Sequence, residues 1–210
     1  MSSNKPTIAF FDFDGTLTKG DTLMPFLKFV VGSWRYYLNL VMLSPVLVGY
    51  FLKLVRNDQA KEAVLTRFLR GYKIDDLFEL GAQFSDQVIP SMLRPEGMEK
   101  LRWHQSQGHE CVLVSASFDV WLNSWSESQK MSKPLTSKLY VTHGVVSGKL
   151  DGKNCFGEEK VTRINIHLDG NPATRTYSYG DSIGDAAMVS FADYGYLISK
   201  NRFNLKYKHG

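Results

Sequence analysis

Two short apolar segments that each run into a group of acidic residues constrain the fold of this chain most strongly. Residues 7–12 (TIAFFD) continue into DFDGT, and residues 174–180 (TRTYSYG) continue into GDSIGD. Short segments of this kind, bounded by glycine and acidic residues, are typical of buried strands. Two more segments have the same character, at 110–116 (ECVLVSA) and 194–199. The sequence therefore predicts four strands, two of which end in clustered carboxylates.

Helical patterns separate these predicted strands, over residues 95–107, 118–129 and 158–168. Alternation of strand and helix is typical of α/β folds, in which a parallel sheet carries helices on both faces. We therefore predict a Rossmann-like parallel sheet as the core of the protein. Residues 139–150 interrupt the alternation and predict a β-hairpin flap around a glycine.

The long segment after DFDGT has a helical character. We expect residues 1–18 and 95–210 to form the α/β core and residues 19–94 to form an inserted, all-helical cap. Pro45 predicts a break inside this insert, with one helix over about 24–43 and another over about 46–56, because proline interrupts helical hydrogen bonding. The two helices would form a hairpin.

The predicted hairpin has an unusual composition, because residues 22–57 contain no Asp or Glu and residues 36–52 carry no charge. A membrane-spanning helix needs about 20 apolar residues, whereas this run has 17 and includes proline and glycine. Three interpretations stay open: a buried helix pair, true insertion, and peripheral contact of residues 24–56 with an anionic bilayer. The bases that would face the bilayer are Lys28, Arg35, Lys53 and Arg56.

Composition limits the remaining classes. A chain of 210 residues with 43% apolar and 22% charged residues is large enough for one substantial domain with an insert. Two cysteines cannot build a disulfide framework, and the residues before the first strand lack a signal-peptide core, so we expect a cytoplasmic protein. A net charge of +4 without a basic cluster argues against nucleic acid as a partner. The oligomeric state stays open.

The predicted strand ends indicate a metal site. The carboxyl ends of parallel strands meet at one edge of the sheet, where open α/β sheets bind ligands. Asp12, Asp14, Asp181 and Asp185 all lie there in the predicted fold. Gathered carboxylates repel one another unless a cation neutralises them, and Mg²⁺ prefers oxygen ligands. The sequence therefore predicts a Mg²⁺ site that would also attract phosphate.

The ordered motifs resemble those of the haloacid dehalogenase superfamily: DFDGT at 12–16, a strand ending in Ser115, Lys160 in NCFGEEK, and GDSIGD at 180–185. The insert after DFDGT is similar to a C1-type cap. The stretch VSGKLDGKNCFGEEKV resembles subfamily IB, which contains phosphoserine phosphatases and phosphatidylglycerophosphatase-like enzymes. The resemblance covers nearly the whole chain and implies a Mg²⁺-dependent phosphomonoester phosphatase.

The resemblance gives the two acids of the first motif different roles. Asp12 would be the nucleophile and would form an aspartyl-phosphate intermediate. Asp14 would protonate the leaving alcohol and then activate the water that hydrolyses the intermediate. Dehalogenase-like members lack an acid at this second position, so Asp14 favours phosphomonoester hydrolysis.

The other matched residues would bind substrate or metal. The resemblance implies phosphate binding by Thr16, Ser115, Ala116 and Lys160. It implies Mg²⁺ binding by Asp12, Asp181, Asp185 and the backbone carbonyl of Asp14. In the cap, the residues that match the amino- and carboxylate-binding groups of phosphoserine phosphatases are Asp21 and Arg67. An ordinary role in capping a helix explains Asp21 equally well.

The sequence leaves several substrates open. DFDGT and the Ser-Ala-Ser-Phe sequence at 115–118 fit lipid-phosphatase-like enzymes better than phosphoserine phosphatases. The basic, apolar hairpin would suit a phospholipid headgroup phosphate, such as phosphatidylglycerophosphate, at the inner face of the cytoplasmic membrane. One alternative is a phosphatase for a small metabolite, such as phosphoserine or histidinol phosphate. A non-enzymatic alternative is a receiver-like, phosphate-responsive binding module.

Overall fold

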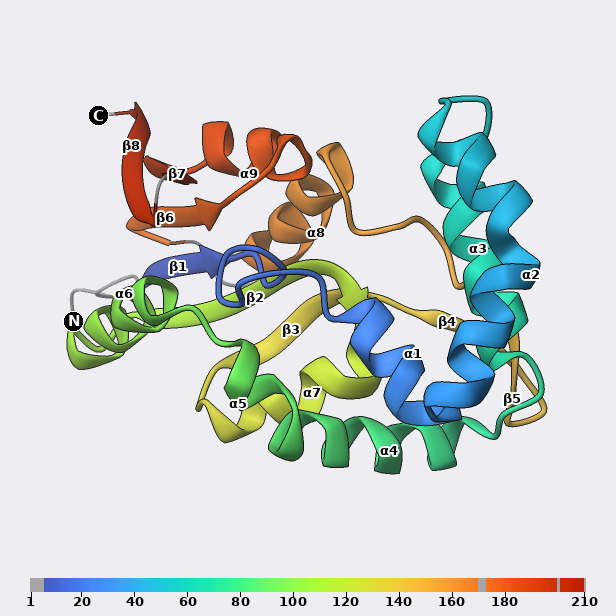
Figure 1. The fold of residues 1–210 in the computed structure, drawn as a ribbon. Helices are drawn as coiled ribbons and strands as arrows, with labels where there is room; N and C mark the ends of the chain where they lie inside the picture. The colour runs from blue at the N-terminus through green and yellow to red at the C-terminus, as the bar shows by residue number, and fades with distance from the viewer. Residues whose placement is uncertain (1–5, 170–172, 200, 210) are drawn as a thin grey trace.

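The computed structural model describes residues 6–169, 173–199 and 201–209, and within them six strands form one sheet in the order β3-β2-β1-β6-β7-β8. The strands are β1 (Thr7–Phe11), β2 (Glu110–Phe118), β3 (Ser132–Ser137), β6 (Arg175–Gly180), β7 (Tyr194–Ser199) and β8 (Arg202–Lys208). Neighbours pair in parallel except β7 and β8, which are antiparallel. The predicted α/β fold with a parallel sheet is confirmed (Figure 1).

Side-chain alternation along β1 builds two separate cores, because successive strand residues point to opposite faces. The helices around the sheet are α6 (Pro95–Ser106), α7 (Asp119–Ser128), α8 (Glu158–Asp169) and α9 (Ala186–Phe191). Ile8 and Phe10 belong to the core under α8 and α9. Ala9 and Phe11 belong to a larger core that includes side chains of α6 and α7. Both faces of the sheet are therefore covered by helices.

Between β1 and β2, the described residues include five further helices, here called the helical insert (residues 23–92). They are α1 (Leu23–Val31), α2 (Ser33–Phe51), α3 (Asn57–Leu69), α4 (Ile74–Gln87) and α5 (Ile89–Met92). α4 packs against α7 of the core, and α2 and α3 stand side by side at one end of the molecule (Figure 1). The domain bounds given above stay a prediction.

The predicted β-hairpin is present and packs against the helical insert. It consists of β4 (Leu139–Thr142) and β5 (Val145–Leu150). The hydroxyl of Thr66 in α3 donates to the carbonyl of Gly148, with 3.1 Å between the oxygens. A Cβ at Gly148 would lie 2.3 Å from the Cα of Thr66, and the residue has a φ of 86°. Glycine is therefore required for this close approach.

The predicted helix break at Pro45 is wrong, because α2 continues through this residue. Proline has no N–H for the carbonyl of Val41, but the hydroxyl of Ser44 donates to that carbonyl over 2.7 Å. The chain turns instead at Gly32, whose φ of 78° separates α1 from α2. The two helices that pack side by side as a hairpin are α2 and α3.

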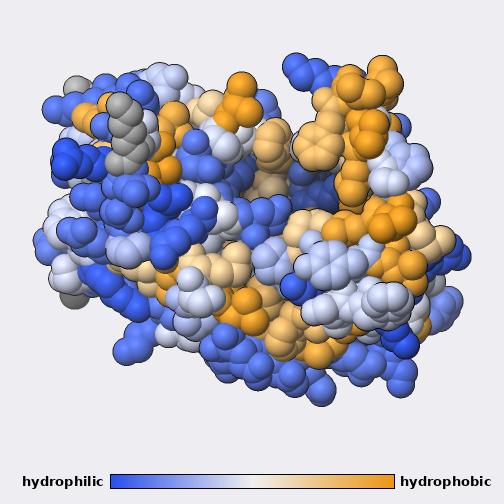
Figure 2. Space-filling view, in the orientation of Figure 1, coloured by the Kyte–Doolittle hydropathy of each residue, from blue (hydrophilic) through white to orange (hydrophobic). Residues whose placement is uncertain are grey.

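The end of α2 exposes large apolar side chains to solvent. They form a surface here called the apolar tip, made of Val48, Phe51, Leu52 and Leu54. Phe51 and Leu54 are each 79% exposed. Figure 2 shows hydrophobic residues gathered on the projecting part of the molecule formed by α2 and α3, beside a hollow in the molecular surface. No helix in the described ranges has the length and apolar character needed to cross a membrane.

The packing of α4 on α7 generates a first prediction, at Gly81. A Cβ on Gly81 would lie 2.0 Å from the carbonyl oxygen of Val120, a backbone atom that cannot move cheaply. Gly81→Ala should therefore lower the free energy of unfolding by about 1–3 kcal/mol in urea denaturation. Helix propensity alone favours alanine over glycine by about 0.5–1 kcal/mol, so a loss identifies the steric contact.

Gly20→Ala is the matched control, because no atom lies within 4 Å of a Cβ at this position. Its unfolding midpoint should stay close to that of the wild type. Equal midpoints for the two variants would contradict the proposed close contact between α4 and α7.

Candidate active site

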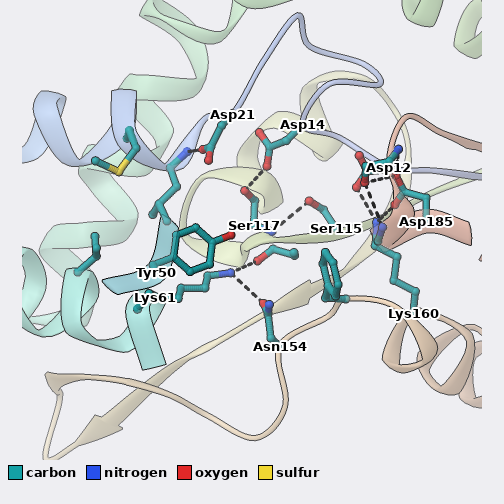
Figure 3. A pocket seen from close by; sticks show the side chains of 18 of the residues that line it. Asp12, Asp14, Asp21, Tyr50, Lys61, Ser115, Ser117, Asn154, Lys160 and Asp185 are labelled. Carbon is teal, nitrogen blue, oxygen red and sulfur yellow. Dashed lines mark hydrogen bonds and ion pairs between the residues drawn. The ribbon is translucent and has the colours of Figure 1, made fainter. Parts of the chain in front are cut away.

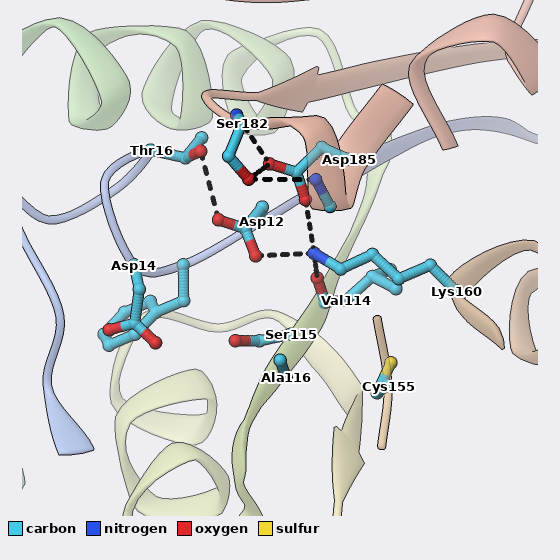
Figure 4. Close-up of polar contacts among 12 residues, drawn as sticks. Asp12, Asp14, Thr16, Val114, Ser115, Ala116, Cys155, Lys160, Ser182 and Asp185 are labelled. Carbon is cyan, nitrogen blue, oxygen red and sulfur yellow. Dashed lines mark hydrogen bonds and ion pairs between the residues drawn. The ribbon is translucent and has the colours of Figure 1, made fainter. Parts of the chain in front are cut away.

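The ammonium of Lys160 joins the ends of two neighbouring strands (Figure 4). Its Nζ donates to Oδ1 of Asp12, directly after β1, and to Oδ1 of Asp185, beyond β6, with both distances 2.6 Å. A third bond of 2.9 Å reaches the carbonyl of Val114 in β2. All three charged side chains are buried. Because buried ion pairs are unfavourable unless their hydrogen bonds are satisfied, this network fixes the geometry of the strand ends.

Asp185 is held on both sides. Its Oδ2 accepts bonds from the backbone N–H of Asp181 (3.0 Å) and from the backbone N–H and hydroxyl of Ser182 (both 3.1 Å). Burial alone would raise the pKa of Asp185, but Lys160 and these backbone donors bring it below its ordinary value. Asp185 is therefore an anchored, ionised carboxylate.

Three carboxylates form a cluster suited to a metal ion. Oxygen atoms of Asp12, Asp181 and Asp185 lie within 4.8 Å of one another. Burial raises the pKa of Asp12 well above its ordinary value, and burial together with Asp185 raises that of Asp181 to about 6. One ammonium thus leaves excess negative charge among hard oxygen donors. This donor set fits Mg²⁺.

Asp14 is held apart from this cluster, although it is only two residues from Asp12. Its Oδ1 accepts bonds of 2.7 Å from both the backbone N–H and the hydroxyl of Thr22, and its Oδ2 accepts from the hydroxyl of Ser117 (Figure 3). Burial, with the nearby charge of Asp21, raises the pKa of Asp14 to about 6. Its carboxyl group is therefore separately oriented and less acidic than an ordinary aspartate.

Asp12, Asp14, Lys160 and Asp185 line one pocket of about 330 Å³, and Asp181 lies outside its lining. The core contributes its polar side, with Asp12, Asp14, Ser115, Ala116, Lys160 and Asp185. The helical insert contributes mainly apolar side chains, Leu23, Met24, Leu47, Ala60 and Val64, together with the polar groups of Tyr50 and Lys61. A polar floor thus faces an apolar wall. Thr16 does not line the pocket; its hydroxyl donates to Oδ2 of Asp12 over 3.2 Å and supports that carboxylate.

The two residues predicted in the cap have different positions. Asp21 lines the pocket, and its carboxylate also accepts a bond from the backbone N–H of Leu23 at the start of α1. The prediction for Arg67 needs correction, because this side chain lies outside the pocket. Its guanidinium donates to Oδ1 of Asn39 (2.8 Å) and contacts the sulfur of Met42, both in α2.

Sequence reasoning missed Lys61 of α3, which reaches from the insert to the core. Its Nζ donates to the carbonyl of Ala116 (2.7 Å) and to Oδ1 of Asn154 (2.8 Å). Burial lowers its pKa to about 8. In the sequence this lysine looks like any solvated helix residue, and the one available signal is its position between the buried residues Ala60 and Val64.

Several known proteins are similar to this chain in sequence or in fold. The protein CicA of Caulobacter vibrioides is 31% identical over 201 residues, which cover 95% of this chain and 89% of CicA. A crystal structure of a Bordetella pertussis protein of unknown function superposes with a TM-score of 0.76 at 22% identity, covering 90% of this chain and 87% of that one. A probable phosphoserine phosphatase from Vibrio cholerae shares the fold with a TM-score of 0.66 at 14% identity, over 90% of this chain and 55% of that one.

The family assignment rests on most of the chain. Residues 9–190 match the haloacid dehalogenase-like hydrolases, a range that contains every motif residue discussed above. This match favours an enzyme and does not support the receiver-like binding module. The chain is therefore a member of the haloacid dehalogenase-like hydrolase family.

Proposed function

We propose that this hydrolase cleaves phosphate monoesters through an aspartyl-phosphate on Asp12, and that its substrate is the terminal phosphate of an anionic phospholipid headgroup. One observation carries the proposal: the carboxylates of Asp12 and Asp14 face one pocket but are held by different partners. Two carboxyl groups with separate environments suit the separate roles of nucleophile and general acid.

Catalysis proceeds in two displacements. An oxygen of Asp12 attacks phosphorus, the bond to the alcohol oxygen breaks, and Asp14 gives the departing alcohol its proton. Asp14 then takes a proton from water as that water attacks the phosphoryl group, which releases phosphate and restores the carboxylate of Asp12 and the protonated form of Asp14. Thr22 and Ser117 keep Asp14 in place for both steps.

The remaining polar groups bind the phosphoryl oxygens. Ser115 and Ala116 lie at the end of β2 and line the pocket beside Asp12, where a hydroxyl and a backbone N–H serve as donors. Lys160 contributes positive charge at the same place. Such preorganised donors are effective because transition-state charge accumulates on those oxygens.

Asp12, Asp181 and Asp185 would hold Mg²⁺, with the backbone carbonyl of Asp14 as a further ligand. The excess of carboxylate charge and the all-oxygen donor set support this assignment. When bound, Mg²⁺ neutralises phosphate charge and helps to orient the substrate.

The apolar wall supports a lipid substrate. A phospholipid carries its phosphate at a bilayer surface, so the enzyme needs a surface that approaches lipid. Leu47 and Tyr50, which line the pocket, are each followed in the sequence by a residue of the apolar tip, Val48 and Phe51. Lys53, between Leu52 and Leu54 of the apolar tip, adds positive charge there, and residues 22–57 contain no acidic residue, which favours an anionic bilayer.

A small soluble metabolite is the second candidate. Asp21 lines the pocket and provides a carboxylate for a substrate ammonium, as in phosphoserine. The Vibrio cholerae protein with the same fold is named a probable phosphoserine phosphatase. Phosphate release from phosphoserine, histidinol phosphate and micellar phosphatidylglycerophosphate, measured side by side with Mg²⁺, separates the candidates. Preference for the micellar lipid supports the phospholipid headgroup phosphate as the substrate.

The nucleophile gives the most direct prediction. Asp12→Asn should reduce phosphate release from every substrate by about 10³-fold or more, because an amide cannot form the covalent intermediate. Asp151→Asn, at an exposed position outside the pocket, is the control and should retain wild-type activity. Substantial turnover by Asp12→Asn would exclude the covalent route.

Metal binding can be tested without turnover. Mg²⁺ should raise the melting temperature of the wild type, because a ligand at 100 times its Kd stabilises the folded state by about 2.7 kcal/mol. Asp181→Asn removes one carboxylate of the cluster and should weaken this shift at a given Mg²⁺ concentration. Asp151→Asn should show the full shift. Equal shifts in all three proteins would place the ion elsewhere.

If the apolar tip contacts the membrane, acidic side chains placed on it should prevent binding. The wild type should sediment with vesicles that contain phosphatidylglycerol, and Phe51→Asp with Leu54→Asp should abolish this, because each apolar side chain contributes about 1.5–3 kcal/mol on full burial. Ile166→Asp in α8, where the residue is 71% exposed, is the matched control and should still sediment. Sedimentation that is the same for both variants would contradict contact through the tip.

A further inference from the structure

Lys61 is a half-buried cation whose hydrogen-bond partners are uncharged. Its two described acceptors, the carbonyl of Ala116 and Oδ1 of Asn154, are both neutral, and its Nζ lies 4.7 Å from the centre of the Phe118 ring. Among the described residues no carboxylate forms an ion pair with it. Lys160, in contrast, is matched by two carboxylates. Asp14 and Asp21, which line the same pocket, favour the charged form of Lys61, but no described ion pair joins either carboxylate to its ammonium.

Partial burial of an ammonium carries a desolvation cost. Lys61 is nevertheless held by two good hydrogen bonds, and these use two of the three N–H donors of an ammonium. The side chain lines the pocket, so the remaining donor is available to a ligand there. An anionic group of a ligand in the pocket would accept a hydrogen bond from this remaining donor.

The position of Lys61 relative to the reaction centre limits what that group can be. Its acceptor Ala116 is the residue after Ser115, so the ammonium adjoins the phosphoryl site from the side of the insert (Figure 3). The phosphoryl group itself is served by Lys160 on the opposite, core side. Tyr50 and Asn154 line the pocket together with Lys61. A group that meets Lys61 is therefore the next part of the same substrate.

We propose that Lys61 forms a second anion subsite, which binds a negatively charged group of the substrate that is not hydrolysed. The group is a phosphodiester or a carboxylate, joined to the reacting phosphate by a short alcohol linker. This proposal rests on the proposed phosphatase function and deepens it: the enzyme prefers phosphate monoesters that carry a second negative charge. A phospholipid headgroup supplies a phosphodiester, and phosphoserine supplies a carboxylate.

A purely structural role for Lys61, as a latch between insert and core, makes different predictions. Asn154→Asp preserves the shape of the site and the acceptor for Lys61 but places a carboxylate beside the ammonium. A latch would be strengthened by this ion pair, and activity would be kept on every substrate. A subsite would be filled by its own internal counterion and would lose affinity for a second anion.

The test compares substrates with and without the second charge. Glycerol 3-phosphate has none, phosphoserine adds a carboxylate, and glycerophosphoglycerol phosphate adds a phosphodiester. Lys61→Met and Asn154→Asp should each lose about tenfold or more in kcat/KM on a charged substrate beyond any loss on glycerol 3-phosphate, mainly through KM. Lys61→Arg should restore most of the preference. Which charged substrate is affected identifies the carboxylate or the phosphodiester.

Equal losses on all substrates, or full activity of Asn154→Asp, would overturn the subsite. Calorimetry in an Asp12→Asn background separates this from failure of the phosphatase function. There the diester compound should bind about tenfold more tightly than glycerol 3-phosphate, and Lys61→Met should remove the difference. No hydrolysis by the wild type would reject the phosphatase alone, whereas a binding preference that ignores Lys61 would reject the subsite alone.

Discussion

The buried network around Lys160 fixes the site on which all other features of this protein depend. One ammonium holds the carboxylates of Asp12 and Asp185 at the ends of β1 and β6, and the carbonyl of Val114 ties it to β2. These strands are neighbours in the sheet, so the network also fixes their relative ends. A charge buried in this way is tolerated because every proton of the ammonium has an acceptor. The rest of the pocket is arranged around this rigid point.

Hydrogen bonds to Asp14 couple the helical insert to the core. Asp14 accepts two bonds from Thr22, the residue just before α1, and the hydroxyl of Thr22 also accepts a bond of 3.3 Å from the indole of Trp121 in α7. Orientation of Asp14 therefore depends on how the insert sits on the core. Lys61 provides a second link from α3 to the end of β2. Both links end beside the same reacting position.

Local patterns predicted the parts of the site that follow directly from strand ends. Asp12, Asp14 and Asp181 adjoin apolar strands, and the structure places Asp12 and Asp14 in the pocket and Asp181 in the carboxylate cluster beside Asp12, because parallel strands end together. The edge strands β3 and β8 were not predicted. SKPLTS contains a proline and little alternation, whereas RFNLKYK alternates, with Phe203, Leu205 and Tyr207 at every second position, and this signal was overlooked. The position of Pro45 inside α2 depends on a single hydroxyl of Ser44, which no periodicity reveals.

Which side chains of α3 face the pocket depends on how the helix is rotated about its axis, and the sequence alone did not provide this rotation. Lys61 and Arg67 belong to the same helix, but six residues turn an α-helix through about 600°, so their side chains leave it about 120° apart. One faces the core pocket and the other faces α2. A basic residue in approximately the right segment was therefore insufficient to locate the cap contact with the core.

The close approach of Gly148 to Thr66 has a consequence for how the chain folds during synthesis. The two residues are separated by 82 positions, so α3 emerges long before the strand against which it packs. At about 5–20 residues per second the ribosome needs roughly 4–16 s to deliver that strand. During this interval the insert has no hairpin to cover α3, and its apolar helices are open to chaperones or to aggregation. The helix α3 therefore reaches its final packing only after the strand that carries Gly148 has been made.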